Sequence, residues 1–174
     1  MTWSILARDG DGRFGVAIAS RFFAVGALCV HTRRAVGALA TQALMNPLYG
    51  PAGLARLAEG GLPAEAFASG AGRPLAERLI AALLAGDAAG GDKRGKQSAA
   101  LRIHGDEDYP ELDIRVDDHA EPIVELQRLY EASFERFQPF VACLPGRHDA
   151  AGELDRARIE ERIEAFHRAR LRPR

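Results

Sequence analysis

The chain has 174 residues, of which 47% are hydrophobic and 27% are charged. This length fits one domain, or one domain with a short appendage, and the apolar fraction excludes wholesale disorder. The net charge of −1 argues against nucleic acid as a partner. No apolar run approaches the ~18 residues of a membrane span, and the first residues lack a secretory signal. We therefore expect a cytoplasmic protein.

A strand, a tight turn and a returning strand are predicted at the start of the chain. Residues 2–9 alternate in a strand-like way and end in Asp9-Gly10-Asp11-Gly12, whose glycines supply the positive φ angles of a hairpin turn. Residues 14–21 form the partner strand. The turn is also similar to part of a calcium loop, but the later ligands and the closing Glu are missing, so we interpret it as a turn.

A second pair of strands is predicted at 25–32 and 35–42. Both segments are small and apolar on both faces, which is typical of strands covered on both sides in a layered sandwich. Arg33 and Arg34 lie between them. These two residues fit a solvated turn, and the alternative is a role in binding an anion or a substrate carboxylate.

The middle of the chain predicts helices. The first begins near Pro51 and ends at Gly60-Gly61, and a short one follows at about 63–67. Residues 74–85 have the clearest helical spacing, with Gly86 as the stop signal.

The second half continues in a similar pattern. In chain order we expect a polar glycine loop at 90–96, strands at 97–104 and 110–116, an amphipathic helix from Pro122, a linker at 138–152 and a last helix at about 153–171. One face of the last helix carries Ile159, Ile163 and Phe166. This stripe predicts a homo-oligomer in which the helix packs on a partner subunit.

The glycine loop has part of a nucleotide-binding pattern. Gly90-x4-Gly95-Lys96 matches most of a P-loop, but Gln97 stands where the magnesium-binding Ser or Thr belongs. The loop also joins a helix to a strand, which reverses the order that a P-loop needs. We therefore interpret it as a structural turn, or as a turn that lends Asp92, Arg94 or Gln97 to a pocket.

Two further groups of reactive side chains have structural explanations. Asp117-Asp118-His119 could be considered as a metal site, but adjacent residues of a strand point to opposite faces, so a polar strand end is favoured. Cys29 and Cys143 form no Cys-x-x-Cys pair and are expected to be buried thiols, without a disulfide or a zinc site.

Thr2 is a candidate nucleophile. If Met1 is removed, the hydroxyl of Thr2 could attack a carbonyl with its own α-amine as general base. A free α-amine has a pKa of about 7.7–8.0, which suits proton transfer near neutral pH. By itself a threonine at this position is more often the first residue of a strand.

The sequence resembles a bacterial family known as domain of unknown function 1028, which is grouped with the N-terminal-nucleophile (Ntn) hydrolases. Five segments in the same order carry the resemblance, and they span most of residues 2–130. They are Thr2-Trp3-Ser4-Ile5-Leu6-Ala7-Arg8-Asp9, Gly15 to Gly26, Ala40-Thr41-Gln42-Ala43 with Asn46-Pro47-x-Tyr49-Gly50, Gly90-Gly91-Asp92-x-Arg94-Gly95-x-Gln97-Ser98-Ala99, and Asp113-x-Arg115-Val116-Asp117-Asp118-His119.

The resemblance implies an α+β fold, a four-layer αββα sandwich over residues 1–137, with 138–174 as a linker and C-terminal helical appendage. It also implies that Thr2 is the nucleophile. Ser20 and Arg21 would orient it, and Arg33 would be a cation beside it that stabilises the developing oxyanion. The implied substrate-binding residues are Gln42, Asn46, Asp92, Arg94 and Gln97.

The chain departs from the family pattern in its centre. Family members usually carry a sizeable segment between what are here Ala66 and Phe67, and this chain has only a short loop there. The resemblance nevertheless implies an amidohydrolase that cleaves a small amide or peptide bond, with no metal or organic cofactor. The alternative is a catalytically inactive binding or structural protein on the same scaffold, with a link to the cell wall.

Overall fold

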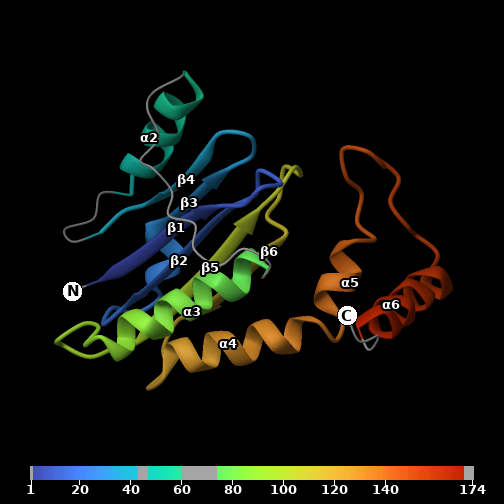
Figure 1. Cartoon of the computed structure of the whole chain (residues 1–174). Coiled ribbons are helices and arrows are strands. Elements are labelled where there is room, and N and C mark those ends of the chain that lie inside the picture. The colour runs from blue at the N-terminus through green and yellow to red at the C-terminus, as the bar shows by residue number, and fades with distance from the viewer. Residues whose placement is uncertain (1, 43–46, 60–73, 171–174) are drawn as a thin grey trace. The chain divides into compact units, whose positions relative to one another are not determined.

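The computed structural model describes residues 2–42, 47–59 and 74–170. It is a mixed α+β structure with two compact units, Met1–Arg128 and Leu129–Arg174 (Figure 1). No helix within the three described ranges is both long and apolar enough to cross a membrane. In chain order the elements are β1 (Trp3–Arg8), β2 (Phe14–Ser20), α1 (Val25–Cys29), β3 (Val30–Arg33), β4 (Gly37–Ala40), α2 (Tyr49–Ala58), α3 (Leu75–Ala88), β5 (Ser98–His104), β6 (Leu112–Val116), α4 (Pro122–Ser133), α5 (Phe137–Val141) and α6 (Arg156–Arg170).

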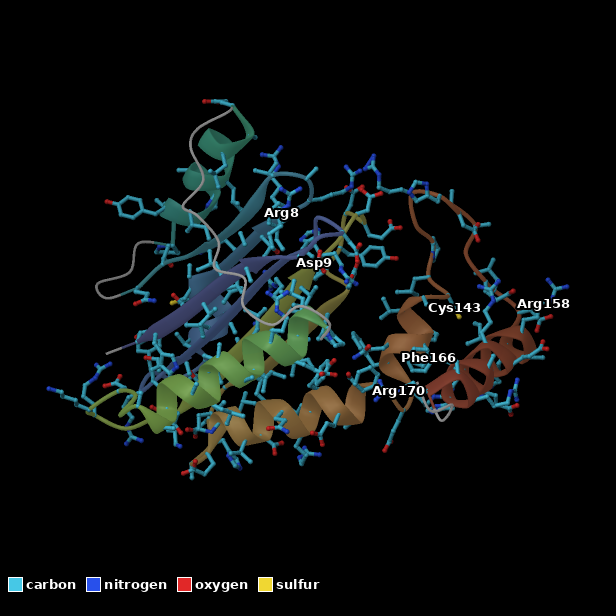
Figure 2. All side chains as sticks on the ribbon, in the orientation of Figure 1. Arg8, Asp9, Cys143, Arg158, Phe166 and Arg170 are labelled. Carbon is cyan, nitrogen blue, oxygen red and sulfur yellow. The ribbon has the colours of Figure 1, made fainter. Side chains whose placement is uncertain are left out.

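The main sheet of the first unit is antiparallel, with strand order β1-β2-β5-β6. The predicted hairpin at the start of the chain is confirmed, since Trp3 pairs with Ala19 and Arg8 with Phe14. Its turn is held by Asp9, which Figure 2 labels beside Arg8. The Asp9 carboxylate accepts the backbone N–H of Arg13 at 2.9 Å and its Nε at 2.7 Å, so this carboxylate is used within the turn.

A second antiparallel sheet contains β3 and β4. It packs on β1 and β2, while α2 packs on β3 and β4, and α3 covers the opposite side of the main sheet (Figure 1). The interior between the two sheets is apolar because alternate residues of each strand face it. Its members are Leu6, Val16, Ile18, Val25, Cys29, Val30, Ala38, Ala40 and Ala100.

The predicted strand at 25–32 is wrong in its first half, where the chain forms the short helix α1. Ala24 adopts a left-handed conformation with φ of 51°, which turns the chain after β2. Gly26 then lies against the main sheet so closely that a Cβ there would be 2.3 Å from Ala100 Cβ. The small residues of this segment therefore serve a close helix-to-sheet contact rather than a strand with two covered faces.

The predicted end of the 74–85 helix is also wrong, because α3 continues through Gly86 to Ala88. Gly86 makes room for an indole: a Cβ on it would lie 3.1 Å from Trp3 Nε1. The missing side chain of Gly86 therefore allows close packing against Trp3. The helix ends later, before Gly90 and Gly91, both of which have positive φ. The short helix expected at 63–67 lies outside the described residues.

The second unit contains α5, α6 and the end of α4. Part of the predicted linker is helical, since α5 spans Phe137–Val141. The stripe on α6 packs inside this unit: Ile163 is buried, and Phe166 stacks on Phe134 with ring centroids 6.3 Å apart. Arg170 lies over the same Phe134 ring, and Figure 2 shows Phe166 and Arg170 together. The apolar stripe of α6 thus packs on residues of its own chain and does not argue for a partner subunit. Homo-oligomerisation stays a prediction.

Candidate active site

Thr2 lies beside Ser20 at one end of the main sheet. Trp3 pairs with Ala19, so the β1–β2 register brings the preceding residue, Thr2, opposite Ser20. Their hydroxyl oxygens, Thr2 Oγ1 and Ser20 Oγ, are 2.8 Å apart, which is a hydrogen bond. Ser20 is fully buried and Thr2 is half-buried. The pair therefore joins one hydroxyl that solvent can reach to one that it cannot.

Ser98 continues this polar row and was missed by the sequence reasoning. It pairs with Ser20 across β2 and β5, and it is also fully buried. Its hydroxyl donates to the carbonyl of Phe22 at 2.5 Å and accepts the N–H of Val25 at 3.1 Å. Ser98 therefore fixes the turn that follows Ser20. The signal in the sequence was a serine inside the apolar strand at 97–104.

Gln42 reaches the same end of the sheet from the segment that follows β4. Its Nε2 donates to Ser4 Oγ at 2.5 Å. Thr2 and Ser4 lie two residues apart along the strand direction, so their side chains share a face. Gln42 is thus placed on the side of β1 that carries Thr2, and its role in substrate binding stays a prediction. Asn46, the neighbouring predicted residue, lies outside the described residues.

Arg21 and Gln97 also gather near Ser20. The N–H of Gln97 donates to the carbonyl of Ser20 at 2.8 Å, and its Nε2 donates to Asp118 Oδ1 at 3.0 Å. Arg21 is exposed, and its Nη1 donates to the Lys96 carbonyl at 3.4 Å. The structure therefore brings together, at one sheet end, residues that lie far apart in the sequence.

The glycine loop packs beside the start of β1 and carries a buried carboxylate. A Cβ on Gly91 would lie 3.4 Å from the Trp3 ring. The Asp92 carboxylate has no exposed surface and accepts Arg94 Nη2 at 2.7 Å and the backbone N–H of Arg94 at 3.0 Å. The Arg94 guanidinium holds the pKa of Asp92 well below its usual range, although burial acts in the opposite direction.

The structure of this loop does not support a P-loop. It joins α3 to β5, so it precedes a strand rather than a helix. The cation that would bind phosphate, Lys96, forms ion pairs with Asp87 and Glu121, each at 2.6 Å, which raise its pKa. A lysine with two carboxylate partners is poorly suited to receive a further anion.

Arg33 lies beside the opposite end of the main sheet from Thr2, so its predicted place next to the nucleophile is wrong. It is the last residue of β3, next to Thr32, whose hydroxyl bonds to His104 Nδ1 at 3.0 Å. His104 pairs with Phe14 at the start of β2, whereas Ser20 ends that strand. Seven strand residues span about 20 Å. No local pattern in the sequence predicts the register of β3, and β3 begins only at Val30 because the first half of 25–32 is helical.

The Asp117-Asp118-His119 segment is engaged in local hydrogen bonds. Asp118 Oδ1 accepts a hydrogen bond from Gln97 Nε2. His119 Nδ1 accepts the N–H of Glu121 at 3.0 Å, next to the start of α4. In the described ranges, no group of three or more His, Cys, Asp or Glu side chains could hold a metal ion. Burial raises the pKa of the Cys29 thiol, which makes it less nucleophilic.

Two comparisons match this chain to known proteins. Residues 2–69 and 62–126 match the family described as "Family of unknown function (DUF1028)". The crystal structure of protein SPO2555 from Silicibacter pomeroyi, also assigned to DUF1028, superposes with a TM-score of 0.77. It is 21% identical and covers 88% of this chain and 99% of its own, so it shows the fold alone. A search of curated proteins found no match.

Proposed function

The chain belongs to DUF1028, a family of unknown function, and we propose that it is an amide hydrolase whose nucleophile is the hydroxyl of Thr2. The observation that carries the proposal is the 2.8 Å contact between Thr2 Oγ1 and the buried Ser20 Oγ. Because the Ser20 hydroxyl is buried, its hydrogen bond would hold the Thr2 oxygen in one orientation at this end of the sheet. Thr2 also directly precedes β1, and removal of Met1 would give it a free α-amine.

The reaction has two balanced steps. The Thr2 oxygen adds to the amide carbonyl carbon while its proton passes to the α-amine. The C–N bond then breaks, the leaving amine takes that proton, and an ester on Thr2 remains. In the second step water adds to the ester with the α-amine again as base, and the carboxylic acid leaves as Thr2 regains its proton.

Ser20 is proposed to position the nucleophile. Its hydroxyl can donate to Thr2 Oγ1, which would stabilise negative charge that develops on that oxygen. Asp92 is proposed to bind the α-ammonium form of Thr2, because its loop packs on Trp3, the next residue, and its low pKa keeps it ionised. A carboxylate there would orient the amine.

The layer arrangement supports an Ntn-type sandwich as the scaffold. The helix α2, the β3–β4 sheet, the main sheet and α3 contact one another in that order. We propose that this is the αββα architecture, with the substrate amide bound at the end where Thr2, Gln42 and Gln97 gather.

A binding protein without turnover is the second candidate. The observation in its favour is that, among the described residues, no cationic side chain bonds the Thr2 hydroxyl, since Arg33 lies at the other end. A cation beside the oxygen would have stabilised its ionised form.

The two candidates are separated by a matched pair of variants. N-acyl 4-nitroanilides with different acyl groups are incubated with protein whose Thr2 amine is free, and release of 4-nitroaniline is recorded. Thr2→Ser keeps a hydroxyl and should retain release, whereas Thr2→Ala should abolish it. Binding of an anilide that is equal in both variants, with no release in either, would favour the binding protein.

A further inference from the structure

Thr32 and His104 form a polar pair between the two sheets. Thr32 belongs to β3, His104 is the last residue of β5, and Thr32 Oγ1 lies 3.0 Å from His104 Nδ1. Val30, two residues before Thr32, packs into the apolar interior, so the Thr32 side chain also faces the main sheet. His104 is buried and Thr32 is half-buried. The pair therefore lies at the rim of that interior, beside the end of the main sheet opposite to Thr2.

The hydrogen bonds of His104 determine which ring nitrogen can accept a proton. Its Nε2 lies 2.9 Å from the carbonyl oxygen of Glu107, and a carbonyl oxygen can only accept a hydrogen bond. In the neutral ring Nε2 therefore carries the hydrogen, and Nδ1 carries the lone pair. The Thr32 hydroxyl consequently donates to Nδ1. A hydroxyl that donates to an imidazole with a fixed tautomer is the arrangement that activates a nucleophile.

The backbone N–H of Thr32 is not used by the β3–β4 ladder. The Thr41 N–H donates to the Cys29 carbonyl at 2.9 Å, which makes these two residues a hydrogen-bonded pair of that ladder. Bonded and unbonded pairs alternate in an antiparallel ladder, so the N–H of Thr32, which lies opposite Ala38, points away from β4. No described strand pairs with β3 on that side. This N–H can therefore donate to an oxygen that develops negative charge close to Thr32 Oγ1.

A cavity of about 320 Å³ lies beside the pair. Its lining residues are Thr32, Arg33, Arg34, Val36, His104 and Asp108. The charges are mixed, because Asp108 is a carboxylate and Arg34 already forms an ion pair with Asp106 at 2.8 Å. The lining therefore does not select an ion of either sign, and the volume suits a small molecule.

We propose that Thr32 and His104 form a second catalytic site, which hydrolyses small uncharged esters. The Thr32 oxygen adds to the ester carbonyl carbon while its proton passes to His104 Nδ1. The C–O bond to the alcohol then breaks, the alcohol takes that proton, and an acyl group remains on Thr32. Water adds to this acyl group and gives a proton to Nδ1. The carboxylic acid leaves, and the Thr32 oxygen takes the proton back from Nδ1.

An ester suits this pair better than an amide. The acceptor behind His104 Nε2 is the neutral carbonyl of Glu107, and a carboxylate there would stabilise the imidazolium more strongly. An ester has a more electrophilic carbonyl and a better leaving group than an amide, so it demands less of the imidazole as acid and base. The site shares no residue with the Thr2 end and does not depend on the proposed amide hydrolase.

Diisopropyl fluorophosphate, a small uncharged probe of activated hydroxyls, tests the nucleophile on the full chain. The Thr32 oxygen would form a bond to phosphorus, the P–F bond would break with loss of fluoride, and the Thr32 proton would pass to His104. Intact mass and fragmentation locate the adduct. We expect it on Thr32, also in Thr2→Ala, which lacks the proposed amide-hydrolase nucleophile. Thr32→Val has the same shape without the hydroxyl and should carry no adduct at this position.

Hydrolysis of 4-nitrophenyl acetate tests turnover. All rates are measured in the Thr2→Ala chain, so that the proposed amide hydrolase does not contribute. Adding Thr32→Ser keeps a hydroxyl and should retain saturable hydrolysis, whereas Thr32→Val or His104→Gln should lower kcat/KM at least about 100-fold. His148→Gln changes an exposed histidine of the second unit and controls for direct attack by surface imidazoles. It should leave the rate unchanged.

The outcomes separate this site from the Thr2 site. An adduct on Thr2 alone would support the amide hydrolase and contradict the second site. Hydrolysis that is equal with and without Thr32→Val would also overturn the proposal, as would the absence of both adduct and hydrolysis. Because Thr32→Val and Thr32→Ser differ only in whether the hydroxyl is kept, the comparison remains decisive if His104→Gln fails to fold.

Discussion

Thr2 Oγ1 and Ser20 Oγ lie 2.8 Å apart although 18 residues separate them in the sequence. The β1–β2 register creates this contact, because each strand residue has a fixed partner from Arg8 and Phe14 at the turn to Trp3 and Ala19 at the open end. A slip by one residue would move the Ser20 hydroxyl to the other face of the sheet. The Asp9 turn thus determines the geometry at the far end of the hairpin.

Ser20→Ala should lower kcat about 10- to 100-fold and change KM little, because the hydroxyl is proposed to act on the oxygen that carries charge in the transition state. The free energy of unfolding should fall by only about 1 kcal/mol, since Thr2 can bond to water instead. Steady-state kinetics and urea unfolding measure the two effects. The control is Ser4→Ala, on the same face of β1, which removes a hydrogen-bond partner of Gln42 and should therefore change KM rather than kcat. An equal loss of kcat in both variants would contradict a positioning role for Ser20.

Ser98→Ala should destabilise the fold by about 2–3 kcal/mol. The substitution would leave the Phe22 carbonyl and the buried Val25 N–H without their partner. Urea unfolding monitored by Trp3 fluorescence measures the change. Ser98→Thr keeps a hydroxyl at the same place and serves as the comparison. A loss below about 0.5 kcal/mol in Ser98→Ala would show that water replaces the hydroxyl and that the turn does not depend on it.

Asp92→Asn should destabilise the protein in a way that depends on pH. The carboxyl has a lower pKa in the folded chain than in the unfolded chain, so its ionisation stabilises the fold above about pH 4. That contribution is lost as the pH falls toward the folded-state value. The gap in unfolding free energy between native chain and variant should therefore be largest near neutral pH and narrow in acid. A gap that stays constant with pH would contradict ionisation of Asp92 as its cause.

Arg33→Ala should leave amide hydrolysis unchanged, because Arg33 lies at the Phe14 end of β2 and Thr2 lies at the Ser20 end. Initial rates of 4-nitroaniline release, with the N-acyl 4-nitroanilide that the native chain cleaves fastest, measure the effect of Arg33→Ala. Arg21→Ala is the informative comparison, since Arg21 follows Ser20 directly and should affect kcat or KM. A drop in rate for Arg33→Ala and none for Arg21→Ala would reverse the assignment of the two arginines.

Local signals predicted the elements with strong patterns. The Asp-Gly turn identified the first hairpin, and the apolar spacing of 74–85 identified α3, because both signals come from residues close in sequence. The segment 25–32 was misread because small apolar residues suit both a covered strand and a helix packed tightly on a sheet. The close contact of Gly26 with Ala100 distinguishes the helix from a covered strand, and the two residues of that contact are far apart in the sequence.

The site was predicted in part for the same reason. Ser20 ends β2, Arg21 follows it, and Gln97 directly precedes the paired strand β5, so the three lie together. The approximate ends of these strands could be predicted from the sequence. Arg33 was misplaced because its position depends on the length of β3 and on how the second sheet lies on the first. Ser98 was missed because its importance comes from the Phe22 and Val25 backbone groups, which no local pattern reveals.

Intact-mass spectrometry after incubation with an acylating amide probe tests the nucleophile assignment most directly. The account predicts a chain that lacks Met1 and carries one acyl group, with fragmentation placing that group on Thr2 and Thr2→Ala remaining unmodified. A chain that keeps Met1 in its native host, or an acyl group on another residue, would contradict Thr2 as the nucleophile.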